Sequence, residues 1–161
     1  MFVVDTNIFV YAANEDSPFH GPCSALLEAW RAESAAWYST WSIQFEFLRV
    51  VTHARVLRNP WSLPRAWQFV ETTRLSPGFS MLVPTDRHAE VAARTFHEFP
   101  DLAGNLLHDA HIAILMREHG IRAICTRDAA FHRFPFLEVI DPLTGVHDRR
   151  GPRRVRSPLL L

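Results

Sequence analysis

Short apolar segments alternate along the chain with stretches in which apolar residues recur at helical spacing. Each apolar segment holds three or four residues bounded by polar or turn-forming residues, which is typical of buried strands in a parallel sheet. The predicted strands are residues 1–4, 36–39, 81–83, 123–125 and 137–140, the last at a sheet edge. The predicted helices begin near residues 8, 22, 42, 63, 86 and 106. This alternation predicts an α/β domain with helices on both faces of a mostly parallel sheet.

Polar residues indicate where the predicted helices are capped. Side-chain caps are expected from Thr40 or Ser42, from Thr85 or Asp86, and from Asn105. The helix that follows Ser62 carries Trp67 and Phe69. We expect these rings to pack inside, because exposed tryptophans at helical spacing are uncommon.

The composition is that of a single globular domain. With 161 residues and 48% apolar content, the chain can form a core that needs no disulfide bonds. Its cysteines, Cys23 and Cys125, form no framework, so we expect buried, reduced thiols in a cytoplasmic protein. No apolar run is long enough to span a membrane, and the N-terminus is a core strand instead of a signal peptide. We therefore expect no membrane association.

The zero net charge conceals an uneven distribution. All 17 basic residues are arginine, and the absence of lysine excludes a P-loop, which grips phosphate with one. Residues 1–148 hold all 17 acidic residues and 12 arginines, for a net charge of −5, whereas residues 149–161 hold five arginines. We therefore divide the chain into a domain, residues 1–148, and an arginine-rich tail, residues 149–161. The acidic domain suggests a concentrated anionic site, and the tail is either a contact for a polyanion or a solvated end.

Asp5 stands at the end of the first predicted strand, directly before a helix. Open α/β sheets bind their ligands at the carboxyl ends of the strands, where this carboxylate lies. A carboxylate so close to the core is costly unless it is hydrogen-bonded or bound to a cation. Asp5 could also cap the helix, although Thr6 and Asn7 could do so equally well. The first strand therefore predicts a site, and other residues should converge on Asp5.

Three further acidic residues are expected at the same edge of the sheet. Asp128 follows the fourth predicted strand, and Glu46 and Asp109 lie in the first turns of helices whose N-termini should face this edge. Oxygen ligands without thiolates suit Mg²⁺ or Mn²⁺. Each residue also has an ordinary interpretation: Asp128 could cap a turn, and Asp109 could face solvent. Glu46 has apolar residues on both sides, so it either points outward or is held by a partner. Only their joint placement indicates a site.

The order of these residues resembles that of PIN-domain ribonucleases, in particular VapC-type toxins of toxin–antitoxin pairs. The resemblance rests on the segments FVVDTN, SIQFEFLRV, NLLHDAHIAIL and ICTRDAAFHRFP, and it extends from Met1 to about Pro142. It implies a Rossmann-like, three-layer PIN fold and metal-dependent endonucleolytic cleavage of RNA. It also implies homodimers and inhibition by a small VapB-like antitoxin.

The resemblance assigns roles to individual residues. The family's acidic quartet, which binds Mg²⁺ or Mn²⁺ and catalyses cleavage, corresponds to Asp5, Glu46, Asp109 and Asp128. Its polar supporting positions correspond to Thr6, Asn7 and Thr126. We expect a water activated by the metal to attack the phosphorus in line, with the carboxylates oriented by these polar neighbours. Arg49 and Arg127 are candidates for phosphate contacts, and such contacts would make cleavage fall steeply with salt.

Three alternatives compete with the nuclease. A haloacid-dehalogenase-like phosphatase needs a second acid where the chain has Asn7, and it normally uses a lysine. A zinc hydrolase would use His108 and His111, but no third ligand stands at a recognisable spacing. The third alternative is a PIN-like module that binds RNA or a partner without cutting. The complete quartet argues against it, because unused clustered carboxylates repel one another.

Overall fold

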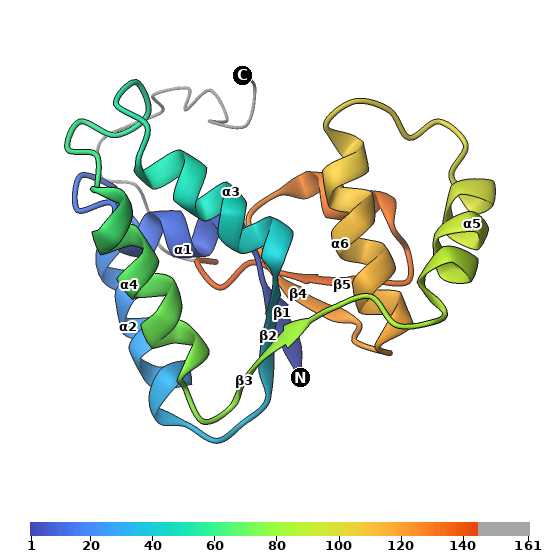
Figure 1. Ribbon diagram of the computed structural model, residues 1–161, viewed down its shortest axis with the longest axis horizontal. Coiled ribbons are helices and arrows are strands. Elements are labelled where there is room, and N and C mark those ends of the chain that lie inside the picture. Colours follow the sequence, from blue (N-terminus) through green and yellow to red (C-terminus); the bar gives the residue numbers. More distant parts are fainter. Residues whose placement is uncertain (145–161) are drawn as a thin grey trace.

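The structure is a computed structural model that describes residues 1–144, and its centre is a five-stranded parallel sheet (Figure 1). The strands are β1 (Phe2–Val4), β2 (Trp37–Thr40), β3 (Phe79–Leu82), β4 (Ala123–Cys125) and β5 (Glu138–Ile140). Their order across the sheet is β3-β2-β1-β4-β5, so β5 lies at an edge, as predicted. The order reverses direction between β1 and β4, and the carboxyl ends at such a switch point are where open α/β sheets bind ligands.

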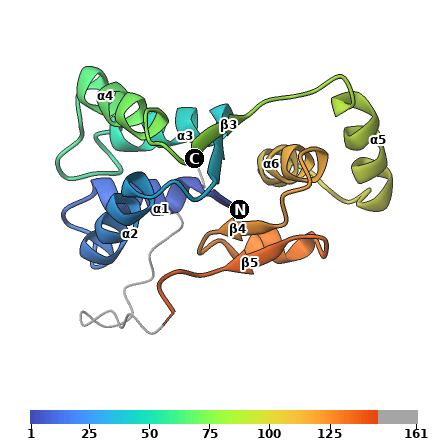
Figure 2. The same cartoon turned by 90° about the horizontal axis from the view of Figure 1, so that it is seen from below.

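Helices cover both faces of the sheet (Figures 1 and 2). The elements between and after the strands are α1 (Thr6–Ala13), α2 (His20–Ala32), α3 (Trp41–Val51), α4 (Leu63–Arg74), α5 (His88–Glu98), α6 (Leu106–Glu118) and the 3₁₀ helix η1 (Ala129–Arg133). One face carries α1, α2 and α4, and the other carries α5 and α6. Helix α3 starts at the carboxyl end of β2 and packs on α1 and α4. The predicted three-layer α/β architecture is confirmed.

The core holds the central strands in place. Val3 and Val4 of β1 have no exposed surface. The ring of Phe9 on α1 meets that of Phe47 on α3 edge-on, with 6.2 Å between centroids. Each fully buried side chain of this size contributes roughly 1.5–3 kcal/mol relative to an exposed one. Because β1 and α1 are anchored in this core, the residues at their junction are held in fixed positions.

The two cysteines belong to this core. Cys23 and Cys125 are free and buried, as predicted. Burial raises the pKa of each thiol to about 12, so both stay protonated at neutral pH. A protonated, inaccessible thiol is a poor nucleophile and a poor metal ligand. In the part of the chain that the structure describes, no helix is long and apolar enough to cross a membrane.

Helix starts differ in part from the predictions. The cap of α3 is confirmed, since the Thr40 hydroxyl accepts a hydrogen bond from the Ile43 N–H at 3.2 Å. The predicted cap of α5 is wrong, because this helix begins at His88 without a side-chain cap. The Thr85 hydroxyl and N–H both donate to the carboxylate of Glu118 on α6. The hydroxyl oxygen accepts from the Arg87 N–H at 3.2 Å, so it serves the turn before the helix instead of the first helical turn.

Asn105 precedes α6 but forms no cap hydrogen bond through its side chain, so this prediction is also wrong. Its backbone is already helical, with φ −63° and ψ −24°. The first turn is wound by bonds between residues three apart, such as the 3.1 Å bond from the Leu107 N–H to the Gly104 carbonyl. These backbone bonds satisfy N–H groups that a capping side chain would otherwise serve.

Three segments begin two residues earlier than predicted. Helix α1 starts at Thr6 instead of residue 8, α2 at His20 instead of residue 22, and β3 at Phe79 instead of residue 81. Phe79 pairs with Trp37 across the sheet, next to the 3.0 Å bond from the Trp37 N–H to the Gly78 carbonyl. Trp67 is 38% exposed, which corrects the expectation that its ring packs inside. The predicted boundary between residues 148 and 149, and the tail itself, lie outside the described residues.

Candidate metal centre at the carboxyl ends of the strands

Asp5 lies where β1 ends and is the N-cap residue of α1. Its backbone N–H donates to the Cys125 carbonyl at 3.1 Å and so extends the pairing of β1 with β4. The residue is only 6% exposed, and its Oδ1 accepts a hydrogen bond from the Thr6 N–H at 2.7 Å. The capping interpretation is therefore correct for one carboxylate oxygen. The other oxygen takes part in a polar network at the end of β4.

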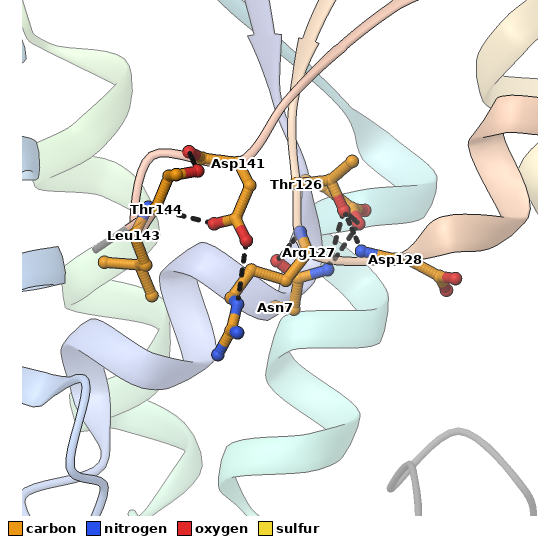
Figure 3. Close-up of polar contacts among 8 residues, drawn as sticks. Asn7, Thr126, Arg127, Asp128, Asp141, Leu143 and Thr144 are labelled. Atoms are coloured by element: carbon orange, nitrogen blue, oxygen red, sulfur yellow. Dashed lines mark hydrogen bonds and ion pairs between the residues drawn. The ribbon is translucent and has the colours of Figure 1, made fainter. Parts of the chain in front are cut away.

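Thr126 is the centre of that network (Figure 3). It follows β4, is fully buried, and donates its hydroxyl hydrogen to Oδ2 of Asp5 at 2.6 Å. The same hydroxyl oxygen accepts from Nδ2 of Asn7 at 2.8 Å and from the Asp128 N–H at 2.9 Å. One threonine thus fixes the Asp5 carboxylate and the start of the segment that carries Asp128.

Asn7 closes the network from α1. Its Nδ2 also donates to Oδ2 of Asp5 at 2.8 Å, and its Oδ1 accepts from the Arg127 N–H at 3.3 Å. The predicted supporting residues Thr6, Asn7 and Thr126 therefore all touch the Asp5 carboxylate, Thr6 through its backbone. A carboxylate restrained by three donors has one orientation, which is the arrangement that ligating groups require from their neighbours.

Asp109 lies in the first turn of α6 and is half-buried. Burial raises the pKa of its carboxyl group to about 7, and the negative charges of Asp128 and Asp5 add to this shift. Burial likewise raises the pKa of Asp5 to about 6, with further contributions from Asp128 and Glu46, although hydrogen bonds from Thr126 and Thr6 oppose the shift. The four predicted acidic residues are thus close enough for their charges to interact.

Glu46 differs from the three aspartates in having a cationic partner. Nε and Nη2 of Arg49, one helical turn further along α3, donate to its two carboxylate oxygens at 2.7 and 2.6 Å. Both side chains are partly exposed, 28% for Glu46 and 41% for Arg49. Glu46 is therefore held by a partner, which is one of the two possibilities suggested by its apolar sequence context, the other being a side chain that points outward.

Asp128 also serves as a cap. It is the N-cap residue of η1, and its Oδ1 accepts from the Ala130 N–H at 2.8 Å. The predicted capping role of Asp128 is therefore confirmed. Asp128 also lies close to the other acidic residues, because its negative charge raises the pKa of both Asp5 and Asp109. The cap hydrogen bond fixes the orientation of the Asp128 carboxylate. The carboxylates of Asp5 and Asp109 lie nearby, so a cation bound there would be attracted by all three.

The Arg127 side chain points away from the carboxylates. Its Nε donates to Oδ2 of Asp141 at 3.3 Å (Figure 3), and its guanidinium carbon lies 4.3 Å from the centroid of the Phe19 ring. Asp141 follows β5, and Phe19 precedes α2, so neither contact has a local signal in the sequence. Sequence reasoning missed both partners for this reason. By contrast, the pairing of Glu46 with Arg49 could have been found from their three-residue spacing.

The donor set fits a hard divalent cation. Asp5, Asp109 and Asp128 present only oxygen atoms, and none of them is paired with a basic side chain among residues 1–144. Burial raises the pKa of Asp5 and of Asp109, and the negative charge of neighbouring carboxylates adds to both shifts; a bound cation would offset that charge. Within the same residues, however, no three acidic, histidine or cysteine side chains are close enough to hold one ion. The side chains would therefore have to draw together around an ion, with water or substrate oxygen completing its coordination.

A short parallel sheet with acidic residues at its carboxyl edge is the arrangement of a PIN domain, and comparison with known proteins supports this. The PIN-domain profile matches residues 2–137, so the chain belongs to the PIN-domain family. Ribonuclease VapC48 of Mycobacterium tuberculosis is 31% identical over 141 residues, which are 88% of this chain and 97% of that protein. Ribonuclease VapC43 of the same species is 34% identical over 145 residues, 90% of this chain and 97% of that protein. Within the family, the chain is of the VapC type.

Solved structures show the same fold. VapC20 of M. tuberculosis, described as a sarcin–ricin loop cleaving toxin, matches with a TM-score of 0.62 and 22% identity over 86% of this chain and 98% of its own. FitAcB from Neisseria gonorrhoeae matches with a TM-score of 0.56 and 16% identity over 88% of this chain and 98% of its own. At such identities the likeness concerns the fold alone. The predicted PIN fold is confirmed, and membership of this family sets aside the phosphatase and zinc-hydrolase alternatives.

Proposed function

We propose that this protein is a Mg²⁺- or Mn²⁺-dependent endoribonuclease, the toxin of a VapBC-type toxin–antitoxin pair. The observation that carries the proposal is the electrostatic interaction among four carboxylates from four separate segments at one edge of the sheet, with Asp5 held by Thr126 and Asn7. The ribonuclease names of its relatives VapC48 and VapC43 support the same conclusion.

Asp5 and Asp109 are proposed as the principal ligands of the ion, with Glu46 and Asp128 completing the cluster. Once bound, the ion supplies activation of a water molecule and stabilisation of the charge that develops on the phosphate. Thr126 and Asn7 keep the Asp5 carboxylate in one orientation, and the Thr6 N–H restrains its second oxygen. Glu46 would bind the ion through a lone pair that Arg49 leaves free, with its negative charge partly offset by that arginine.

RNA must be held beside an acidic site, which requires cations at its rim. Arg49 is proposed as one phosphate contact, because it already lies next to Glu46. Arg127 is proposed as a second, although it must then leave Asp141. We also propose that the protein forms a homodimer and is inhibited by a VapB-like antitoxin. VapBC2 of Rickettsia felis, a complex solved with a DNA fragment of its promoter, matches this chain with a TM-score of 0.57.

The proposal is tested by incubating purified protein with a structured RNA in Mg²⁺ or Mn²⁺, in EDTA, and after the substitution Asp109→Asn. Cleavage is expected with metal and lost in the other two conditions. Cleavage that persists in EDTA, or in a folded Asp109→Asn variant, would contradict the assignment of the site. RNA that binds but is never cut would favour the alternative of a non-catalytic PIN-like module.

A further inference from the structure

The three aspartates of the carboxylate site differ from the other acidic side chains that this domain covers. Seven acidic residues among residues 1–144 are buried or partly buried. Four of them have a basic partner: Glu46 pairs with Arg49, Glu71 with Arg74, Glu118 with His88, and Asp141 with Arg127. Within the same residues, the remaining three, Asp5, Asp109 and Asp128, have none. The domain therefore leaves a concentrated negative charge that a basic group from elsewhere can neutralise.

The described part of the chain ends at the same edge of the sheet (Figure 3). Asp141 directly follows β5, and the turn behind it is held by 2.9 Å bonds from the Leu143 N–H and the Thr144 hydroxyl. The Asp141 carboxylate also accepts from Arg127, whose own N–H donates to Asn7 in the network at the end of β4. Residue 145 therefore continues from the edge of the carboxylate site.

The arginine-rich tail, residues 149–161, has the charge that the site lacks. It holds five arginines and no acidic residue, against a net charge of −5 for residues 1–148. The arginines follow Thr144 by five to twelve residues, so an extended chain carries them as far as about 17 Å to about 40 Å from it. A guanidinium is always charged and matches a carboxylate with two donors, as Arg49 does on Glu46.

We propose that arginines of the tail bind Asp5, Asp109 and Asp128 of the same chain when no metal ion is present, so that the tail holds the nuclease inactive until Mg²⁺ or Mn²⁺ displaces it. Because the tail is tethered beside the site, its effective concentration there is in the millimolar range, which lets a weak contact compete with a metal ion. The inference rests on the proposed ribonuclease function and adds a regulation of the same site.

RNA is the other partner that five arginines would suit, because each phosphate contact releases counterions. Two observations favour the carboxylates as the occupant. The tail continues from the edge of the sheet where they lie, so its arginines reach them without a second molecule. The three unpaired aspartates also repel the phosphates of RNA until a cation is bound, whereas they attract a guanidinium in the metal-free protein.

Trypsin cuts after arginine and therefore measures whether the tail is bound. In the full-length protein, cleavage within the tail should be about fivefold slower in EDTA than in saturating Mn²⁺, the factor that corresponds to one partly exposed ion pair. The loop between α3 and α4 is the internal control: Arg55 and Arg58 are exposed there, and cleavage after them should be equally fast in both conditions. In the variant Asp109→Asn, Asp128→Asn the tail should be cut rapidly even in EDTA.

The affinity for Mn²⁺ gives a second measurement, by isothermal titration calorimetry without RNA. Replacing the tail arginines by glutamine keeps the chain length and should tighten Mn²⁺ binding by about fivefold. This variant carries the substitutions Arg149→Gln, Arg150→Gln, Arg153→Gln, Arg154→Gln and Arg156→Gln. The matched control removes the same charge at exposed positions of the domain: Arg55→Gln, Arg58→Gln, Arg87→Gln, Arg94→Gln and Arg122→Gln. It should leave the affinity unchanged, because salt at about 0.15 M screens exposed charges beyond about 8 Å.

The possible results separate the inference from the proposed function. Tail cleavage at one rate in EDTA, in Mn²⁺ and in the aspartate variant would overturn the inference, while RNA cleavage by the unmodified protein would leave the ribonuclease function standing. A tail that the aspartate variant releases, in a protein that never cuts RNA, would support the contact and overturn the function.

RNA binding, measured by fluorescence anisotropy with a labelled oligoribonucleotide, covers the other occupant. If the five-glutamine variant binds RNA more weakly and trypsin cuts the unmodified tail equally fast with and without Mn²⁺, the tail is an RNA-binding arm and the inference is wrong.

Discussion

Arg49 donates hydrogen bonds to both carboxylate oxygens of Glu46, at 2.7 and 2.6 Å, and so neutralises one of the four predicted metal ligands. No basic side chain among residues 1–144 does the same for the three aspartates. A metal ion that binds Glu46 must therefore compete with the Arg49 guanidinium, which already neutralises that carboxylate. The aspartates carry negative charge that protons or a cation can neutralise. Of the four predicted ligands, the three aspartates are thus free of a basic partner among residues 1–144, and Glu46 is paired with Arg49.

The substitution Arg49→Gln should strengthen the binding of Mn²⁺ in the absence of RNA. A partly exposed ion pair is worth about 0.3–1 kcal/mol, so the gain should be about twofold to fivefold. Isothermal titration calorimetry measures it. The matched control is Arg74→Gln, which breaks a comparable pair with Glu71 at 2.8 Å on α4 and should leave the affinity for Mn²⁺ unchanged. An Arg49→Gln variant with unaltered affinity would show that Glu46 is not a ligand.

The metal-free protein should lose stability as the pH rises from acidic to neutral. Asp109 and Asp5 have pKa values of about 7 and about 6 in the folded state, against 3.8 for an ordinary aspartate. Between these values the folded state binds more protons than the unfolded state, so the free energy of unfolding falls as the pH rises. Thermal unfolding in EDTA, followed from about pH 5 to about pH 8, measures this. A pH profile identical to that of Asp109→Asn would contradict the raised pKa of Asp109.

The substitution Asp109→Asn should stabilise the metal-free protein at pH 8 and abolish cleavage. It removes a half-buried charge that is repelled by Asp128 and Asp5, and the expected gain in the free energy of unfolding is on the order of 1–2 kcal/mol. Added Mg²⁺ should raise the melting temperature of the unmodified protein more than that of the variant, because the ion binds only the folded state. A variant that Mg²⁺ stabilises equally would show that Asp109 is not a ligand.

Thr126→Val should weaken metal binding by about 10- to 100-fold, the usual effect of removing a residue that orients a ligand. Valine has the shape of threonine but cannot donate to Asp5 or accept from Asn7 and the Asp128 N–H. Thr126→Ser keeps the hydroxyl and should restore most of the affinity. Because Thr126 is fully buried, unfolding curves must accompany the Mn²⁺ titration. Equal affinities for the valine and serine variants would contradict the orienting role.

Much of the fold could be predicted because its signals are local. The strand Ala123–Cys125 was predicted with its exact bounds, since three apolar residues stand between polar ones. The Thr40 cap follows from a polar residue before an apolar helix. The failures at Thr85 and Asn105 have tertiary or backbone causes: a carboxylate from α6 binds Thr85, and the chain at Asn105 is already helical. A propensity for capping does not show which partner competes for the side chain.

The site was predictable to the extent that it depends on topology. Parallel strands bring Asp5 and Asp128 to one edge whatever the details of packing, and both carboxylates lie there. The partners of the arginines depend instead on where side chains from distant segments meet. Arg127 is adjacent to Asp128 in sequence, yet its guanidinium lies against Phe19 and Asp141. Closeness in sequence to an acidic residue therefore does not place an arginine at the site.

Arg127 contacts RNA only if it can leave Asp141, and the substitution Asp141→Asn tests this. Removing the competing charge of a half-exposed pair should raise RNA affinity by about twofold to fivefold, measured by anisotropy in the Asp109→Asn background. Adding Arg127→Gln should cancel that gain. The matched control is Asp101→Asn, which frees Arg133 from a comparable pair at 2.8 Å. If both single substitutions raise affinity equally, the effect is that of overall charge, and Arg127 stays bound to Phe19 and Asp141 as a structural residue that positions the segment carrying Asp128.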